Sequence, residues 1–337
     1  MHAEYEAAMK TIGFFDFSME GKILIKGPGR IDFINGLVSN DVKLLKENQG
    51  CYAAFLNKSG KILSDCTIYK FPDFLLLNMN LIGKKNIIDI LKNEAALGKC
   101  EVEDVSLKYA LFSLQGPQAV LFLEQLFGLS IELPTEYENT ILSYPMDSNA
   151  TNSNATTDSA KNEKNSEVIV ARHSRTKPGG FDLFIPSMHY KQMKQKTLEI
   201  RKSLGIQEIS NDTYEMLRLE AKKPVYGIDF DQANILPEIS EKMASYTKGC
   251  YVGQEIVVRV KNLAKGLTSK RLSHFEIQGN ELPKKNDKIM HEDKEAGHIT
   301  SAAFSYEKNK VLAFGFLKKD FFDKSEFEIL GMGARKS

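Results

Sequence analysis

The residues with the clearest chemical potential lie between positions 248 and 255, where two glycines bracket a thiol and an aromatic ring. The segment reads Lys248, Gly249, Cys250, Tyr251, Val252, Gly253, Gln254 and Glu255. Glycine lets a backbone turn sharply or approach a ligand closely, so Cys250 could lie exposed at a turn. Lys248 would then favour the reactive thiolate over the thiol. The same spacing also fits a buried cysteine that packs beside Tyr251, and the sequence leaves both readings open.

A pair of charged residues begins at the end of this segment. Glu255 and Arg259 stand four residues apart, which places both on one face whether the run between them is strand or helix. They could pair with each other, or either could line a pocket beside Cys250. Glu255 could equally be the structural partner of Lys248, whereas we favour structural support as the role of Arg259.

Short strands mixed with helices must position these residues. Apolar runs predict strands at 74–79 and 110–114, and helical spacing of apolar residues predicts helices at 31–37 and 86–97. Two strands at 167–170 and 180–185 flank a Pro-Gly-Gly turn and predict a hairpin. After Lys265, short strands predict a small β-barrel or sandwich, at 271–277, 297–300, 311–317 and 327–330.

Composition excludes several classes of protein. The 337 residues carry 45 Lys and Arg against 44 Asp and Glu, so no overall field draws in nucleic acid or a membrane surface. The four cysteines are dispersed without a C-x-x-C pair, which argues against a metal site. No segment has the roughly 20 apolar residues that cross a bilayer, and the acidic first ten residues do not form a leader. We therefore expect a cytoplasmic protein.

Residues 146–166 interrupt this pattern with Asn, Ser, Thr, Ala and Lys. Such a segment has too few apolar side chains to fold, so we predict a disordered surface insertion there.

Two motifs resemble a known superfamily. The string Lys-Gly-Cys-Tyr-Val-Gly-Gln-Glu at 248–255 resembles the signature of the YgfZ family of folate-binding, iron-sulfur-related proteins. Residues 217–229 are similar to the R-x-E-A-G…G-x-D stretch of glycine-cleavage T-proteins, except that Lys222 replaces the usual glycine. Further superfamily landmarks are similar at 33–41, 56–65, 114–117 and 297–301.

The resemblance implies an α+β fold with two interleaved mixed α/β units and a C-terminal β-barrel in a ring-like arrangement around a folate pocket. We place the folate-binding region at residues 1–264 and the barrel at 265–337.

The resemblance also implies roles for individual residues. Asp65 lies near an acidic residue or pair of T-proteins and is a candidate catalytic carboxylate, with a solvated turn carboxylate as the alternative. Ser64 occupies the first of those positions, where a hydroxyl reduces the acidic capacity. Asp182 matches a pterin-binding glutamate, and Arg218 matches an arginine near the folate. Without the family context these two would be an exposed strand carboxylate and a helix-surface arginine.

The remaining members of the expected site belong to the first motif. Cys250 is the candidate functional thiol. Tyr251 could stack on a pterin or belong to the core. The expected supporting residues are Lys248, Gly249, Gly253, Gln254 and Arg259.

The resemblance implies a folate-dependent accessory protein that binds tetrahydrofolate or a one-carbon derivative and supports iron-sulfur cluster assembly or repair, and thereby tRNA modification by radical enzymes. The expected partners are iron-sulfur proteins or assembly factors. The alternative is an aminomethyltransferase of the glycine cleavage system, supported by the shared landmarks and opposed by Ser64 and the cysteine motif. Direct nucleic-acid binding would require a cationic surface, for which the lysine-rich residues 261–271 are the candidate.

Overall fold

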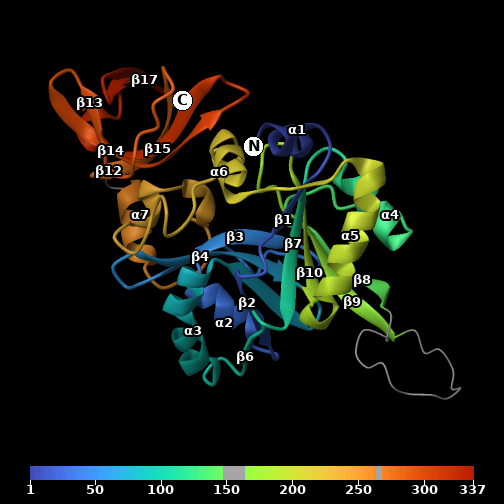
Figure 1. The fold of residues 1–337 in the computed structure, drawn as a ribbon. Coiled ribbons are helices and arrows are strands. Elements are labelled where there is room, and N and C mark those ends of the chain that lie inside the picture. Colours follow the sequence, from blue (N-terminus) through green and yellow to red (C-terminus); the bar gives the residue numbers. More distant parts are fainter. Residues whose placement is uncertain (147–163, 263–267) are drawn as a thin grey trace, which may run out of the picture.

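Two mixed α/β units and a closed β-barrel make up the computed structural model, which describes residues 1–146, 164–262 and 268–337 (Figure 1). The α-helices are α1 His2–Lys10, α2 Arg30–Leu37, α3 Leu81–Ala95, α4 Ala119–Phe127, α5 Tyr190–Leu204, α6 Asn211–Glu220 and α7 Gln254–Asn262. The strands are β1 Gly13–Asp16, β2 Gly21–Lys26, β3 Gly50–Leu56, β4 Ile62–Lys70, β5 Phe74–Met79, β6 Glu101–Asp104, β7 Tyr109–Gln115, β8 Asn139–Met146, β9 Lys164–Arg172, β10 Gly180–Pro186, β11 Gln207–Glu208, β12 Lys270–Ile277, β13 Lys288–His291, β14 Lys294–Ser305, β15 Lys310–Lys318, β16 Glu326–Ile329 and β17 Met332–Lys336.

The first unit is a five-stranded sheet in the order β3-β4-β5-β2-β6, with α2 and α3 packed against it. Helix α2 buries Ile34 and helix α3 buries Ile87 and Leu91 in one core with the apolar side chains of the strands. The strand predicted at 74–79 and the helices predicted at 31–37 and 86–97 are confirmed, because their apolar periodicity matches the buried faces.

The second unit is a six-stranded sheet in the order β11-β1-β7-β10-β9-β8. Strands β9 and β10 pair antiparallel, with Val170 opposite Leu183, so the predicted hairpin is confirmed. Strand β1 pairs with β7 through Phe14 and Leu114, although the entire first sheet lies between them in sequence. The two units are therefore interleaved, as the resemblance implied.

The C-terminal strands close into a barrel in the order β12-β15-β14-β13-β16-β17, which settles the choice between barrel and sandwich. Its interior is filled by apolar side chains such as Phe275, Ile299 and Ile329. The barrel lies at one end of the molecule, beyond α6 and α7 (Figure 1).

A buried ion pair fastens the barrel to the rest of the chain. Arg218 on α6 donates from Nη1 to Oδ2 of Asp229 at 2.8 Å, and both side chains are inaccessible to solvent. The same Asp229 oxygen accepts the backbone N–H of Val225 at 2.9 Å. Its other oxygen accepts the hydroxyls of Thr300 at 2.9 Å and Ser301 at 2.5 Å, both on β14. One carboxylate thus joins α6, the following loop and the barrel.

Two sequence predictions fall on residues outside this description. Strands β8 and β9 pair until Met146 lies opposite Lys164, and residues 147–163 of the predicted insertion lie outside the described residues. The predicted boundary at 264–265 also lies outside them, within 263–267, so the domain boundaries stay a prediction. Across the described part of the chain, no helix combines the length and apolarity that crossing a bilayer requires.

Lys222 has a left-handed backbone conformation of the kind that favours glycine. Its φ of 54° is in the left-handed region, which costs an L-residue about 1–2 kcal/mol and costs glycine almost nothing. The backbone is therefore strained at Lys222.

We predict that Lys222→Gly leaves the fold intact and stabilises it by a few tenths to about 1 kcal/mol, the relief of strain exceeding the entropy that glycine adds to the unfolded chain. Lys223→Gly is the matched control, since Lys223 has no positive φ, and we expect it to destabilise by about 0.5–1 kcal/mol. Chemical denaturation of both variants measures the difference. Equal destabilisation by the two substitutions would contradict the assignment of strain to Lys222.

Candidate active site

A cavity of about 710 Å³ lies where the two α/β units meet. Its wall comes from β3, β4 and β5 of the first unit, the loop before β10 of the second, and the segments 221–226 and 239–243. Among the described residues, none from the barrel lines it. The volume is within the range typical of small-molecule sites.

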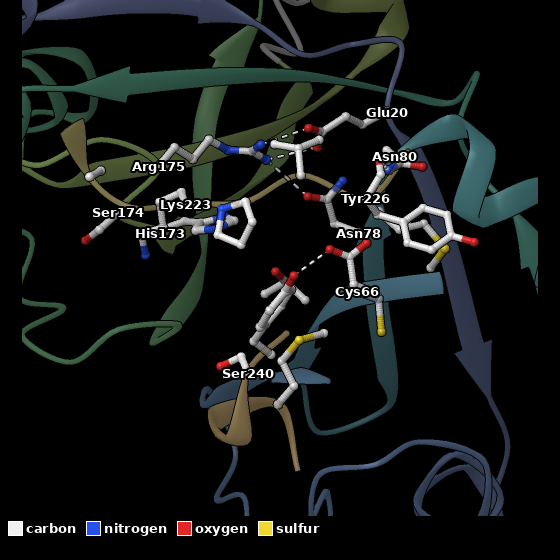
Figure 2. A pocket seen from close by; sticks show the side chains of 18 of the residues that line it. Glu20, Cys66, Asn78, Asn80, His173, Ser174, Arg175, Lys223, Tyr226 and Ser240 are labelled. Atoms are coloured by element: carbon white, nitrogen blue, oxygen red, sulfur yellow. Dashed lines mark hydrogen bonds and ion pairs between the residues drawn. The ribbon is translucent and has the colours of Figure 1, made fainter. Parts of the chain in front are cut away.

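Arg175 organises one end of this cavity (Figure 2). Its Nε and Nη2 atoms donate to the carboxylate of Asp182 at 2.8–3.0 Å, and Nη1 and Nη2 donate to Glu20 at 2.8 and 2.9 Å. Nη2 also donates to Oδ1 of Asn78 at 3.2 Å. The guanidinium lies 4.3 Å from the ring centroid of Phe17. Two carboxylates and an amide therefore hold a buried cation at the cavity wall, the bidentate geometry that arginine favours.

The carboxylate of Asp182 is fully buried on β10 and is not the exposed strand residue considered as an alternative. Burial alone would raise its pKa, but Arg175 and then His173 hold the pKa well below the usual range for aspartate. Nδ1 of His173 lies 2.9 Å from Oδ2 of Asp182 and 3.3 Å from the hydroxyl of Tyr69. Asp182 is outside the cavity lining and acts on the cavity through the two side chains that it holds, Arg175 and His173.

Asp65 lies directly in the cavity wall, on strand β4 rather than in a turn. The hydroxyl of Tyr52 donates to its Oδ2 at 2.5 Å. Burial raises the pKa of Asp65 to about 6, and the hydrogen bond from Tyr52 acts in the opposite direction without offsetting it. A carboxyl group with this pKa changes protonation state close to neutral pH, as a general acid or base requires.

The neighbouring hydroxyl faces the other way. Successive side chains of a strand point to opposite faces, and Ser64 is buried against α3, so close that a Cβ atom at Gly83 would lie 2.2 Å from its Oγ. Ser64 is outside the cavity lining. Ser64 therefore does not face the cavity, so the first of the two objections that the sequence raised against aminomethyl transfer, the hydroxyl at position 64, does not apply to the cavity wall.

The ammonium of Lys248 is directed at backbone carbonyl groups and not at the thiol of Cys250. Its Nζ donates to the carbonyl oxygens of Asn35, Val38 and Asn40 at 2.6–2.9 Å. Burial lowers the pKa of Lys248 to about 8. Cys250 is exposed on a loop outside the cavity lining, and no described hydrogen bond joins it to Lys248. Of the two readings that the sequence left open, the exposed position of Cys250 is the one observed. The ammonium of Lys248, however, binds backbone carbonyl groups of α2 and the loop after it.

Two other residues of the 248–255 segment, Tyr251 and Gly253, pack against the protein interior and do not line the cavity. Tyr251 is buried in a core with Leu236 and Val257, and its ring lies 5.0 Å from Nζ of Lys248. Gly253 has a φ of 80°, and a Cβ atom there would lie 2.6 Å from the carbonyl oxygen of Asn57, so only glycine fits. A Cβ at Gly249, by contrast, would meet open space.

The charged residues that follow lie on the surface. Glu255 and Arg259 are exposed on α7, and Gln254 is half-buried at its start. No ion pair joins Glu255 to Arg259 or Lys248 among the described side chains. The cavity brings together Asp65 and, through Arg175, Asp182. It does not include Arg218, Tyr251 or Glu255, whose contact with folate stays a prediction.

Sequence reasoning missed Arg175, Glu20, Asn78 and Tyr52. The signals were weak but present. Asn78 is a polar residue in the middle of an otherwise apolar buried strand, and Arg175 lies in a loop with Pro and Gly between two strands. Polar residues in such places are frequently functional, because rigid strands position the loops that join them.

We predict that Arg175→Met destabilises the protein by about 3–5 kcal/mol at pH 7, since it leaves Asp182 buried without its cation. Because the pKa of Asp182 is depressed in the folded state, the stabilisation is present above the ordinary aspartate pKa of about 4 and is lost as pH falls. The deficit should therefore shrink below pH 4, as denaturation across pH will show.

Arg172→Met is the control for this substitution. Arg172 is a half-buried arginine over the ring of Phe181, at 5.3 Å, and should cost less than about 1 kcal/mol. A deficit for Arg175→Met that does not change with pH would show that the buried pair is not its cause.

Comparison with known proteins supports the aminomethyltransferase reading. A protein of Caldanaerobacter subterraneus called aminomethyltransferase is 26% identical over 95% of this chain and 80% of its own length. One of Thermotoga petrophila with the same name is 24% identical over 98% of this chain and 85% of its own. The crystal structure of glycine cleavage system aminomethyltransferase T from Bartonella henselae shares the fold, with a TM-score of 0.81 over 99% of this chain and 87% of that one, at 19% identity.

These similarities overturn the function that the 248–255 segment predicted. An accessory role in iron-sulfur cluster assembly, with its iron-sulfur partners and its link to tRNA modification, is wrong as the leading assignment, because relatives over nearly the whole chain carry the other name. The physical reason is that the segment contributes packing, through Tyr251 and Lys248, and no residue to the cavity wall.

Family models cover both parts of the chain. The GCVT N-terminal domain matches residues 1–240, and the glycine cleavage T-protein C-terminal barrel domain matches residues 270–336. The narrower resemblance to the YgfZ family stays a prediction. With the interleaved units, the barrel and the cavity already described, these matches show that the chain belongs to the glycine cleavage T-protein superfamily.

Proposed function

We propose that the chain is an aminomethyltransferase that uses tetrahydrofolate as the acceptor of the one-carbon unit. The observation that carries this proposal is Asp65, a carboxylate in the wall of a cavity large enough for a folate, with a pKa raised to about 6 and a hydroxyl fixing its orientation. The type of reaction is taken from the names of the relatives, and tetrahydrofolate as the acceptor is taken from the resemblance to the superfamily.

Asp65 has the chemistry that the transfer needs. In this reaction the carbon leaves the sulfur of a lipoyl carrier, ammonia is released, and the carbon bonds to two folate nitrogens, each of which loses a proton. One proton goes to the departing sulfur and the other to ammonia. An ionised carboxylate at the folate accepts a proton and passes it on, and a pKa of about 6 keeps Asp65 mostly ionised at pH 7.

The Arg175 cluster supplies the polar end of the cavity. A pterin ring presents a row of donors and acceptors that a carboxylate can bind through two hydrogen bonds. Glu20, held in place by Arg175, and Asn78 both line this end. Asp182 then acts as a positioning residue behind Arg175. Location in the cytoplasm stays a prediction.

The test is an assay with aminomethylated lipoyl carrier protein and tetrahydrofolate, following ammonia and methylene-tetrahydrofolate. We expect activity that requires both substrates and that falls as pH drops through about 6, because protonated Asp65 cannot accept a proton. Asp65→Asn keeps an acceptor for Tyr52 but removes the base, so kcat should fall by about 10²–10⁴.

Ser64→Ala is the matched control, one residue along the same strand and facing α3. It should retain kcat within a few fold. Absence of turnover with any lipoyl carrier, in protein that binds tetrahydrofolate by calorimetry, would overturn the transferase proposal. An equal loss in both variants would point to disruption of β4 and not to chemistry at Asp65.

A further inference from the structure

One residue of the cavity wall combines a proton-accepting atom with a fixed orientation. His173 lies in the loop before β10, beside Ser174 and Arg175 (Figure 2). Its Nδ1 atom is 2.9 Å from Oδ2 of Asp182 and 3.3 Å from the hydroxyl oxygen of Tyr69. Among the described lining residues it is the single histidine. One edge of the imidazole ring is therefore held against a buried carboxylate.

The contact with Asp182 determines which ring nitrogen carries the proton. Burial opposes ionisation of Asp182, but Arg175 and then His173 hold its pKa well below the usual range, so the carboxylate is charged and only accepts hydrogen bonds. A neutral imidazole has one N–H group, which this carboxylate draws to Nδ1 and which leaves the lone pair on Nε2. No described protein group bonds to Nε2, and this atom is not buried, so it is open to a ligand in the cavity.

Few other groups in the wall are free to accept a proton. The described lining residues include three carboxylates, Glu20, Asp65 and Glu215. Glu20 and Glu215 are each ion-paired with a buried arginine. Asp65 and His173 remain, the first on β4 of one α/β unit and the second in a loop of the other.

We propose that His173, oriented by Asp182, is a second proton-transfer group of the aminomethyl transfer and works alongside Asp65. The inference rests on the proposed function, in which two folate nitrogens each lose a proton while the sulfur and the ammonia each gain one. That function places the pterin at the Arg175 end of the cavity, which is also the end where His173 lies.

Each group then carries one of the two protons. When the nitrogen within the pterin ring bonds to the carbon, Nε2 of His173 accepts the proton that this nitrogen loses. The imidazolium gives it to the amino group, which leaves as ammonia when its own bond to the carbon breaks. Asp65 takes the proton of the other folate nitrogen and passes it to the departing sulfur. Both groups end in the state in which they began.

The side chain of His173 can be changed without releasing its loop. The backbone N–H of His173 donates to the carbonyl oxygen of Gly180 at 3.0 Å, and its own carbonyl oxygen accepts from Nε2 of Gln115 at 2.8 Å. His173→Asn keeps an amide N–H close to the position of Nδ1 for the contact with Asp182. It has no counterpart of Nε2, so it removes the proposed proton acceptor alone.

The experiment measures ammonia release and tetrahydrofolate affinity in the wild type and in His173→Asn. We expect kcat to fall by about 10²–10³, within the usual contribution of a general acid or base. Affinity by anaerobic calorimetry should change by no more than about threefold. In His173→Ala, added imidazole should raise kcat about tenfold, because it replaces the missing proton acceptor and not a packing contact.

Nitrogen-15 NMR of the histidine rings tests the orientation without turnover. The signals of His173 in the ligand-free protein are those that disappear in His173→Asn. We expect the neutral ring to carry its proton on Nδ1, as the contact with Asp182 requires. A ring protonated on Nε2 would contradict the inference, since it would have no lone pair to offer the cavity.

His189→Asn is the matched control. His189 is a half-buried histidine just before α5 and outside the cavity lining, so kcat should stay within about twofold of the wild type.

The other outcomes separate this inference from the proposed function. Unchanged kcat in His173→Asn would remove the role of His173 and leave aminomethyl transfer in place. A loss of kcat in His173→Ala that imidazole does not reverse would assign His173 to packing against Asp182. Absence of turnover in wild-type protein that binds tetrahydrofolate would overturn the proposed function and this inference with it.

Discussion

The ion pairs and hydrogen bonds of one buried side chain, Arg175, hold the two walls of the cavity together. Arg175 lies in a loop of the second α/β unit, yet its guanidinium contacts Glu20, which precedes β2, and Asn78 on β5 of the first unit. A buried charge is tolerated only when its partners are in place, so the requirement to satisfy Arg175 fixes the relative position of the two sheets. The polar end of the cavity therefore also connects the two α/β units.

The alternation of side chains along β4 separates residues that pack against α3 from residues that face the cavity. Ser64 and Asp65 are adjacent in sequence, but alternation sends one hydroxyl into the α3 interface and one carboxylate into the cavity. Placing the carboxylate there has an energetic consequence. With a pKa raised to about 6, ionised Asp65 is less stable in the folded protein than in water, so its contribution to stability is lost as pH rises through 6. Strain of this kind is common at catalytic positions.

Sequence reasoning performed best where the signal was periodicity. The strand at 74–79, the helices near 31–37 and 86–97 and the barrel strands all follow from apolar spacing, because that spacing records which face is buried. The helical state of 256–258 remained open, since three apolar residues fit both periods; the structure resolves it as part of α7.

The site was harder to predict because contacts across the chain create it. The eight-residue motif at 248–255 predicted Cys250 as the functional thiol. In the structure Lys248 of this motif binds the carbonyl oxygen of Val38, and Tyr251 packs in a hydrophobic core. Arg175 is held at the cavity wall partly by Glu20, which is far away in sequence and lies close to it only because the two units are interleaved. Asp65 and Asp182 were identified through family resemblance, while the sequence held no sign that Arg175 stands between Asp182 and the cavity.

The interleaved topology has a consequence for synthesis on the ribosome. Strand β1 contains Phe14 and Phe15, and its two neighbours in the sheet are β7 and β11, the latter reached only at Gln207. At about 5–20 residues per second, this strand waits on the order of ten seconds or more before its sheet can be completed. The first sheet can form meanwhile, but the rings of Phe14 and Phe15 in the nascent chain stay without their sheet partners until the second unit emerges.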